Sequence, residues 1–485
     1  MATPIHFLLN DQKITTSEPP GLLVLDFLRR REKLMGTKEG CKEGDCGACG
    51  VLIGELNGHS VSYKPVTSCL VPLGELQGKQ LVTVEGLNME HLSLVQDAIV
   101  TEGGTQCGFC TPGIVVSLTG WLMEKGAAMT ASDVKYALSG HLCRCTGYNS
   151  LKRAGESIIE GAVTLGEKKN SGEIIKTMVE KGFLPEYFTE VPARLRQIHQ
   201  SIKAVKGRKN GKSTVFIAGG TDIYVQRGDT IPDAKVEILN LNPEMRGVKE
   251  QNGEIHIGAL TTFEEFASDP IIQGVIPDIR DFMQLNASLQ IRNRATLGGN
   301  IVNASPIGDM TIFLLALGTR LILKDGDTVR SIPMKKFFLD YKKLAKSPSE
   351  IVTEIIFTAP GPYTNINFEK ASKRKFLDIA SVNSAIRIET EENVIKEIGL
   401  TVGGVAPIPL FMDSTCEFLV DKPINTDVLE EALSIARDEI TPISDVRGTI
   451  EYKCLLTRQF IIAHFTKLFP ELVDVEEALK AVSKF

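Results

Sequence analysis

Cysteines are concentrated in the first third of this 485-residue chain, where eight of the ten fall between residues 41 and 145. The first group consists of Cys41, Cys46, Cys49 and Cys69. Three cysteines spaced C-x4-C-x2-C and followed by a distant fourth form the plant-type [2Fe–2S] pattern. Zinc sites usually combine two C-x2-C pairs, so an iron–sulfur cluster is the favoured interpretation of this group.

Glycines separate the cysteines of the first loop, which reads CKEGDCGACG. Gly44, Gly47 and Gly50 allow the backbone to fold tightly, because glycine tolerates positive φ. A loop of this kind points amide N–H groups inward. Such donors stabilise bridging sulfides and raise the reduction potential of a cluster.

The second group consists of Cys107, Cys110, Cys143 and Cys145, in the strings CGFCTPG and LCRCTGY. A C-x2-C pair followed by a distant C-x-C pair could also bind zinc. Cys110 and Cys145 each precede a predicted helix, and the positive end of a helix dipole suits a negatively charged tetrathiolate cluster. A cluster is therefore favoured, and zinc remains the alternative.

Helix signals surround this second group. Thr111 and Pro112 predict a helix start after Cys110, and this helix runs to Gly126. Thr130 with Asp133 forms a predicted capping box for the next helix, which stops at Gly140. A further helix is expected from about residue 150 to 165.

Short elements are expected around the first group. Residues 5–9 alternate like a strand, and residues 22–34 have the apolar spacing of a helix. Residues 51–56 and 61–64 form a predicted hairpin across Asn57-Gly58. A small sheet crossed by one helix, with the cysteine loop at its rim, is the expected result.

Composition excludes several classes of protein. The net charge is -6 and the pI is about 5.8, so nucleic-acid binding gains no electrostatic support. No apolar run reaches ~18 residues, so no membrane span is expected. The N-terminus MATPIHFLLNDQ has no signal-peptide pattern, which predicts a cytoplasmic location without structural disulfides.

The strings EGCKEGDCGACG, QCGFCTPG and LCRCTGY together resemble the iron–sulfur part of the molybdenum hydroxylases, the family of xanthine dehydrogenase and aldehyde oxidase. The resemblance implies a multidomain α+β protein. A β-grasp ferredoxin domain is expected at 1–88 and a four-helix domain at 89–166, each with one [2Fe–2S] cluster. His141 departs from the family pattern, because a small polar residue is common before LCRC.

The polar segment 167–187 is interpreted as a linker, and α/β alternation follows it. A short β run at 215–218 leads into Gly219-Gly220, and a second glycine pair lies at Gly298-Gly299. Such turns offer amides to a pyrophosphate, although a single glycine pair is more often only a turn. Neither matches G-x-G-x-x-G, which disfavours a Rossmann fold.

Together these turns resemble the flavin domain of the same family, a vanillyl-alcohol-oxidase-like (PCMH-type) FAD domain that is expected here at 188–368. The resemblance implies that FAD binds to two loops. Their residues are Phe216, Ile217, Ala218, Gly219, Gly220, Thr221, Asp222 and Ile223 in the first, and Thr296, Gly298, Gly299 and Asn300 in the second.

Three further residues are implied at the flavin. Asp309 would hold ribitol or ribose hydroxyls, Ile351 would pack near the adenine or flavin edge, and Lys370 would face the flavin. The loop 373–378 would border the ring where a nicotinamide could stack, with a plain exposed loop as the alternative. Residues 369–485 resemble the small C-terminal flavoprotein subdomain, in which Cys416 and Cys454 are expected to be buried apolar residues.

No molybdopterin domain is found before the chain ends at Phe485, so a molybdopterin-binding large subunit is the expected partner. Fusion of the iron–sulfur and flavin modules favours the purine-oxidising branch of the family. Electrons would then pass through two [2Fe–2S] clusters to FAD and on to NAD, in a heterotetramer of two heterodimers. The alternatives are an aldehyde, nicotinate or CO hydroxylase, or a free-standing NADH-oxidising iron–sulfur flavoprotein.

Overall fold

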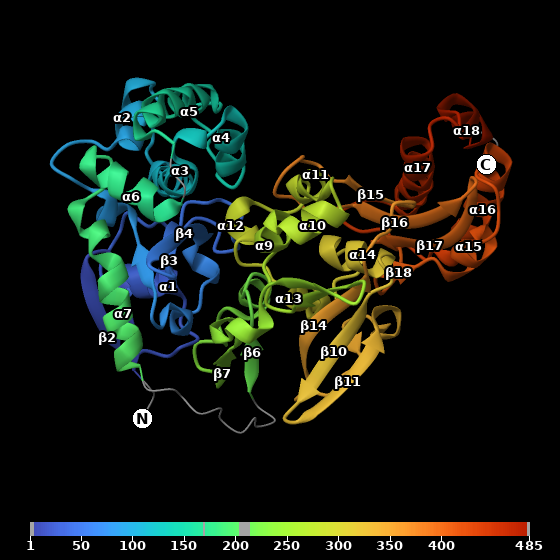
Figure 1. The fold of residues 1–485 in the computed structure, drawn as a ribbon, viewed down its shortest axis with the longest axis horizontal. Helices are drawn as coiled ribbons and strands as arrows, with labels where there is room; N and C mark the ends of the chain where they lie inside the picture. Colours follow the sequence, from blue (N-terminus) through green and yellow to red (C-terminus); the bar gives the residue numbers. More distant parts are fainter. Residues whose placement is uncertain (1–3, 168–169, 203–213, 483–485) are drawn as a thin grey trace. The chain divides into compact units, whose positions relative to one another are not determined.

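The computed structural model describes residues 4–167, 170–202 and 214–482, the last three without their side chains. The chain forms two compact units with a multidomain α+β organisation (Figure 1). The first unit extends to Leu241 and also includes Ser288–Ala295. The second contains Asn242–Ala287 and everything from Thr296 onward.

The first domain of unit 1 is a mixed five-stranded sheet in the order β2-β1-β5-β3-β4. Its strands are β1 (Ile5–Leu9), β2 (Gln12–Thr16), β3 (Gly50–Asn57), β4 (Ser60–Thr67) and β5 (Gln80–Val82). β1 and β5 are parallel and the other pairs are antiparallel, as in a β-grasp domain. The predicted strand at 5–9 and the hairpin are confirmed.

The helix that crosses this sheet is shorter than the predicted segment 22–34. It consists of α1 (Val24–Asp26), continued by a π-helical turn over Phe27–Arg31. Leu23 forms a β-bridge with Pro72, and the Leu22 carbonyl accepts a hydrogen bond from the Leu73 N–H. These backbone pairings hold residues 22–23 extended, so the helix begins later.

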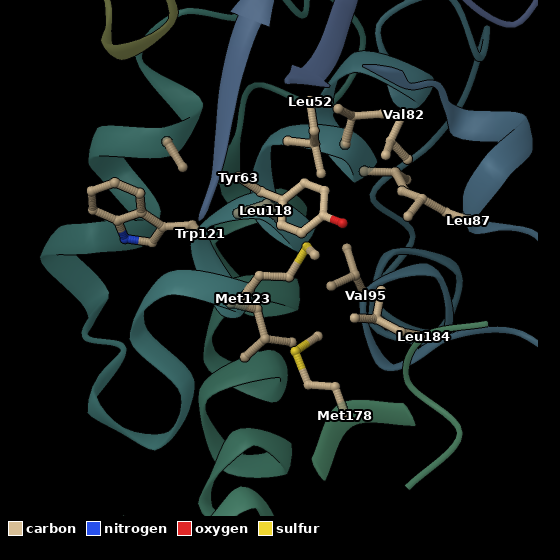
Figure 2. Packing of buried hydrophobic residues seen from close by; sticks show 14 of the residues in the cluster. Leu52, Tyr63, Val82, Leu87, Val95, Leu118, Trp121, Met123, Met178 and Leu184 are labelled. Atoms are coloured by element: carbon tan, nitrogen blue, oxygen red, sulfur yellow. The ribbon is translucent and has the colours of Figure 1, made fainter. Parts of the chain in front are cut away.

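Four helices follow the β-grasp domain: α2 (Leu94–Thr101), α3 (Thr111–Lys125), α4 (Ala131–Leu138) and α5 (Asn149–Ala162). The predicted start after Cys110 and the capping box of Thr130 with Asp133 are both confirmed. Helix α3 is buried along most of its length. Figure 2 shows Leu118 and Met123 of α3 beside Tyr63 of β4, with Trp121 to one side, in the core that joins the two domains.

The segment interpreted as a linker contains a helix, α6 (Ser171–Glu180). Its polar residues face solvent, but Ile174, Ile175 and Met178 are buried in the same core as α3. Asn170 caps the helix by accepting a hydrogen bond from the Glu173 N–H. Helix α7 (Val191–Ser201) is buried there too through Leu195 and Ile198. The polar composition of the segment therefore led to the prediction of a linker, although α6 packs in the core.

Unit 1 also contains a small α/β element. The parallel pair β6 (Val215–Ile217) and β7 (Val236–Ile238) flanks α8 (Ile223–Arg227), and α12 (Leu289–Arg292) lies in the later segment. The predicted strand and the helix start at Ile223 are confirmed.

Unit 2 begins with an antiparallel sheet in the order β11-β10-β14-β9-β8. Its strands are β8 (Val248–Gln251), β9 (Glu254–Gly258), β10 (Arg320–Asp325), β11 (Thr328–Pro333) and β14 (Ile351–Thr358). A minor ribbon pairs β12 (Phe338–Asp340) with β13 (Lys343–Leu344). The accompanying helices are α9 (Phe263–Ser268), α10 (Pro270–Val275), α11 (Ile279–Gln284), α13 (Leu297–Asn303) and α14 (Asp309–Ala316).

The C-terminal domain pairs a four-stranded sheet, in the order β15-β16-β17-β18, with four helices. The elements are β15 (Thr364–Ala371), β16 (Val382–Glu391), β17 (Val394–Gly403), β18 (Leu410–Phe411), α15 (Asp413–Leu419), α16 (Thr426–Glu439), α17 (Ile450–Leu468) and α18 (Val475–Val482). Cys416 is buried as expected, whereas Cys454 is only half-buried. The prediction for Cys454 was wrong because its helix, α17, is partly exposed on that side.

A buried histidine makes the stability of the C-terminal domain depend on pH. His464 is completely buried between Asn367 and Ser384, and burial lowers its pKa to about 3. Below pH 6.5 the unfolded chain takes up a proton that the folded chain does not. Stability is therefore complete above about pH 6.5 and falls by about 1.4 kcal/mol per pH unit as the pH drops toward 3.

Lowering the pH from 7 to 5 is thus expected to cost this domain about 2 kcal/mol through His464. Native-state hydrogen exchange of the β16 amides measures the loss. His464→Gln should remove this part of the pH dependence. An unchanged slope in that variant would contradict the assignment.

Within the part of the chain that the structure describes, no helix is long and apolar enough to cross a membrane.

Candidate electron-transfer sites

The first cysteine group lies in a loop at the rim of the β-grasp sheet. The loop is held by hydrogen bonds from the Lys38 N–H to the Ala48 carbonyl and from the Gly50 N–H to the Gly47 carbonyl. Cys69 comes from the turn after β4, and the neighbouring Ser68 N–H donates to the Cys49 carbonyl. The structure thus places the Cys69 turn beside the loop that carries the other three cysteines.

The four thiols lie in two pairs, Cys41 with Cys46 and Cys49 with Cys69, each in hydrogen-bond contact. The hydrogen bond from the Cys46 thiol lowers the pKa of Cys41 to about 5. Among the described residues, no three His, Cys, Asp or Glu side chains converge as they would around a single metal ion. Each iron of a binuclear cluster is bound by two protein thiolates, so two pairs of thiols are the arrangement that such a cluster would use.

The second group has the same paired arrangement. Cys107 contacts Cys145 near the surface, and Cys110 contacts Cys143 in the interior. Cys110 is the N-cap residue of α3. Burial, followed by the hydrogen bond to Cys143, raises the pKa of Cys110 to about 12. The pairing again fits a binuclear cluster.

The two cysteine loops are directly linked. The Leu142 N–H, next to Cys143, donates a 3.0 Å hydrogen bond to the carbonyl of Cys46. Gly47 is packed against the second loop, where an added Cβ would lie 2.3 Å from His141 Nδ1. Because Gly47 also has a φ of +71°, any side chain there would be strained and would separate the loops.

His141 is the centre of this junction. It is buried, and burial lowers its pKa to about 4, so the ring is neutral. Its Nε2 lies 2.8 Å from Ser117 Oγ and 3.0 Å from Gln290 Nε2. Tyr148 Oη donates to the His141 carbonyl and accepts from the Cys143 N–H. Sequence reasoning singled out His141 as unusual but missed Ser117 and Gln290, because no spacing connects them.

The first glycine turn is held by a buried ion pair. Arg294 donates from Nη1 and Nη2 to the two carboxylate oxygens of Glu75, both at 2.8 Å. Its Nε and Nη2 also donate to the Gly219 carbonyl, at 3.0 and 2.6 Å. Both charged side chains are at most 4% exposed. The Gly219 turn is therefore fixed to the β-grasp domain by Glu75.

The same turn lies beside a cysteine of the first group. Gly220 has a φ of +77°, and an added Cβ would be 2.7 Å from the carbonyl oxygen of Leu70, the residue after Cys69. Cys49 and Cys69 share a buried cluster with Ile217 and Tyr224, which flank the turn. The predicted FAD loop 216–223 therefore packs against Leu70, the residue that directly follows the predicted cluster ligand Cys69.

The second glycine turn, in unit 2, opens α13. Thr296 caps it by accepting a hydrogen bond from the Gly299 N–H at 3.1 Å. Gly298 lies against Ala259, where an added Cβ would approach to 2.7 Å. The Asn300 side-chain oxygen accepts from the N–H and the hydroxyl of Thr311. The turn is therefore held by hydrogen bonds from both ends of the segment and packs closely against the backbone of Ala259.

Asp309 and Lys370 form a buried ion pair in unit 2. Lys370 Nζ donates to Asp309 Oδ2 at 2.7 Å and to the Leu285 carbonyl at 2.8 Å, and its side chain is 1% exposed. Asn383, which sequence reasoning missed, donates to Asp309 Oδ1 at 2.6 Å. In this structure Lys370 is held by Asp309, so its role at a flavin stays a prediction.

The two remaining predicted positions lie elsewhere in unit 2. Ile351 is the first residue of β14 and pairs with Lys324 of β10. The loop 373–378 is closed by its own hydrogen bonds, from the Arg374 N–H to Asp378 and from the Arg374 guanidinium to the Leu377 carbonyl.

Gly219→Ala is expected to abolish most flavin binding. Its Cβ would lie 2.1 Å from the Arg294 carbonyl oxygen, and that backbone is held by the Glu75 ion pair. The flavin absorbance of the purified chain measures the effect. Gly274→Ala is the matched control, because nothing lies within 4 Å of its added Cβ. Full flavin content in Gly219→Ala would contradict a role for this turn.

Four protein-family models match successive parts of the chain. They describe a 2Fe-2S iron-sulfur cluster binding domain at residues 7–73 and a [2Fe-2S] binding domain at 83–156. A FAD binding domain in molybdopterin dehydrogenase matches 189–360, and a CO dehydrogenase flavoprotein C-terminal domain matches 368–468.

Curated relatives are similar along almost the whole chain. Xanthine dehydrogenase of Drosophila subobscura is 29% identical over 96% of this chain, and xanthine dehydrogenase/oxidase of Rattus norvegicus is 28% identical over 98%. The chain spans only 39% and 40% of the length of these two proteins.

A solved structure matches part of the fold. Carbon monoxide dehydrogenase from Hydrogenophaga pseudoflava, in a form that lacks the Mo-pyranopterin moiety, aligns with a TM-score of 0.51 and 25% identity. The match covers 54% of this chain and 91% of that chain. With two 2Fe-2S domains, a FAD-binding domain and a flavoprotein C-terminal domain in succession, the chain belongs to the molybdenum hydroxylase family and corresponds to its iron–sulfur and flavin portion.

Proposed function

We propose that this chain is the electron-transfer part of a xanthine dehydrogenase. A molybdopterin-binding partner oxidises xanthine or hypoxanthine toward urate, and this chain delivers the electrons to NAD. When bound, the clusters supply one-electron transfer, and FAD supplies the exchange between one-electron and two-electron chemistry. We propose that two heterodimers form the complete enzyme and that it works in the cytoplasm.

The residues of this chain divide the work of holding these groups. Cys107, Cys110, Cys143 and Cys145 hold one cluster, and Cys41, Cys46, Cys49 and Cys69 hold the other. The amides of residues 216–223 and of 296–300 bind the FAD phosphates. Asp309 holds sugar hydroxyls of the same cofactor, and Lys370 fixes the orientation of Asp309 through their ion pair.

The continuity of these sites in unit 1 is the observation that carries the proposal. The Cys143 loop is joined to the Cys46 carbonyl through the Leu142 N–H. On the other side of the first site, Leu70 brings the Cys69 turn against Gly220. Electron transfer needs closely spaced carriers, and this chain orders its sites as helical domain, β-grasp domain and flavin turn.

The similarity to xanthine dehydrogenases along almost the whole chain supports the choice of substrate and acceptor. The exposed Cys107 and Cys145 leave one edge of the helical-domain site accessible, as a partner that donates electrons requires. The loop 373–378, with Lys373, Arg374 and Lys375, carries positive charge that suits a dinucleotide.

Steady-state assays of the purified, cofactor-loaded chain test the proposal. The chain alone should reduce an artificial dye with NADH and should not oxidise xanthine. Co-expression with a molybdopterin-binding partner should restore xanthine-dependent reduction of NAD. Xanthine oxidation by the chain alone would refute the need for a partner, and oxidation of an aldehyde or of nicotinate instead of xanthine would refute the substrate.

A further inference from the structure

A cavity of about 380 Å³ lies between α16 and α17 in the C-terminal domain, and none of its lining residues is assigned above to a cluster or to FAD. Its size is within the range of about 300–1,000 Å³ that is usual for small-molecule sites. Residues 433, 436, 437 and 440 line it from one side, a spacing that places them on one face of α16 and its end. The first half of α17 lines the other side.

The floor of the cavity is apolar. Leu433, Ala436 and Ile440 from one side and Ile461 from the other are buried. At the rim, Ile450 and Leu455 expose 43% and 45% of their surfaces. A ligand body in contact with these side chains would be aliphatic or aromatic, because it would remove apolar surface from water.

Two guanidinium groups also line the cavity, from Arg437 and Arg458. The Nε of Arg458 is buried without a hydrogen-bond partner. Among the described residues, neither side chain has an ion-pair or hydrogen-bond partner. The third charged residue of the lining is Glu451, whose carboxylate is exposed. Hydrogen bonds from its own backbone N–H and from the Thr449 side chain lower the pKa of Glu451. The lining therefore carries one excess positive charge.

We propose that this cavity is a binding site for a small amphipathic carboxylate. The carboxylate binds to the Arg458 guanidinium, with Arg437 at the rim, and the apolar body lies on Leu433 and Ile461. A buried arginine nitrogen without a partner is costly, and a carboxylate satisfies it through charge-assisted, bidentate hydrogen bonds. An apolar ligand without charge would leave that nitrogen unsatisfied.

Binding of decanoate and of decanol to the full chain, measured by titration calorimetry, tests this proposal. Decanoate should bind at one site, at least about tenfold tighter than decanol, because only the acid pairs with Arg458. Equal affinities would overturn the recognition of a carboxylate. This comparison uses the unaltered chain and does not depend on the folding of a variant.

The location of the binding site is tested by arginine variants and by the reactivity of Cys454. Arg458→Gln should weaken decanoate binding about tenfold, whereas Arg196→Gln, which removes an exposed arginine of α7, should leave it unchanged. Half-buried Cys454 lines the cavity, so decanoate should slow its alkylation by N-ethylmaleimide, as measured on its peptide by mass spectrometry. Equal weakening in both variants, or no protection of Cys454, would place the binding elsewhere.

Discussion

Replacing Cys69 by alanine is expected to lower the iron content from about four to about two atoms per chain, since each binuclear cluster contributes two irons. Cys69 is paired with Cys49, and removal of one thiolate leaves one iron of that cluster without its second protein ligand. Iron and acid-labile sulfide analysis measures the loss, and the visible absorbance of the clusters should fall to about half.

Two further variants sharpen this result. Cys143→Ala should also halve the iron content, but it should remove the other set of electron paramagnetic resonance signals. Cys416→Ala is the matched control, because Cys416 is buried in the core of the C-terminal domain and belongs to neither predicted ligand set, and it should keep about four irons. Zinc in place of iron in the unaltered chain would overturn both cluster assignments.

Glu75→Leu is expected to destabilise unit 1 by about 3–5 kcal/mol, because it leaves the Arg294 guanidinium buried without its charge partner. Urea unfolding followed by the fluorescence of Trp121 measures the change. Trp121 is the only tryptophan in the chain, and it lies in the core of unit 1, so the signal reports this unit selectively.

The control for this prediction is an ion pair of the same unit that remains in contact with solvent. Glu102→Leu breaks the 3.0 Å pair with Arg153 and should cost at most about 1 kcal/mol. The double variant Glu75→Leu with Arg294→Met should recover part of the lost stability, since it no longer buries an unpaired guanidinium but still leaves the Gly219 carbonyl without its two donors. Equal losses of unfolding free energy in Glu75→Leu and Glu102→Leu would show that the buried ion pair contributes no more to stability than the exposed one.

Local signals in the sequence predicted the elements around the cysteines well. Pro112 and the pair Thr130 with Asp133 marked helix starts, and Asn57-Gly58 marked a hairpin, because each acts on backbone groups within a few residues. The cysteine spacing likewise predicted two groups of ligands, and the structure arranges the cysteines of each group in two contacting pairs. These features need no knowledge of distant contacts.

The missed features all depend on contacts across long stretches of sequence. Glu75 and Arg294 are separated by 219 residues, and His141 and Gln290 by 149. No periodicity records such a pairing, and only folding brings the partners together. The helix α6 was missed for a related reason, since three buried apolar residues in a polar segment become significant only against the core that covers them.

The octapeptide Ser288–Ala295 belongs to unit 1, although the chain on both sides of it belongs to unit 2. Arg292 stacks over Tyr136, Asn293 donates to the Pro65 carbonyl, and Leu289 is completely buried. If the polypeptide were divided between α7 and β6, the second fragment would contain Ser288–Ala295, which packs against residues of the first fragment. We expect the two fragments, produced separately, to reassemble without a covalent link.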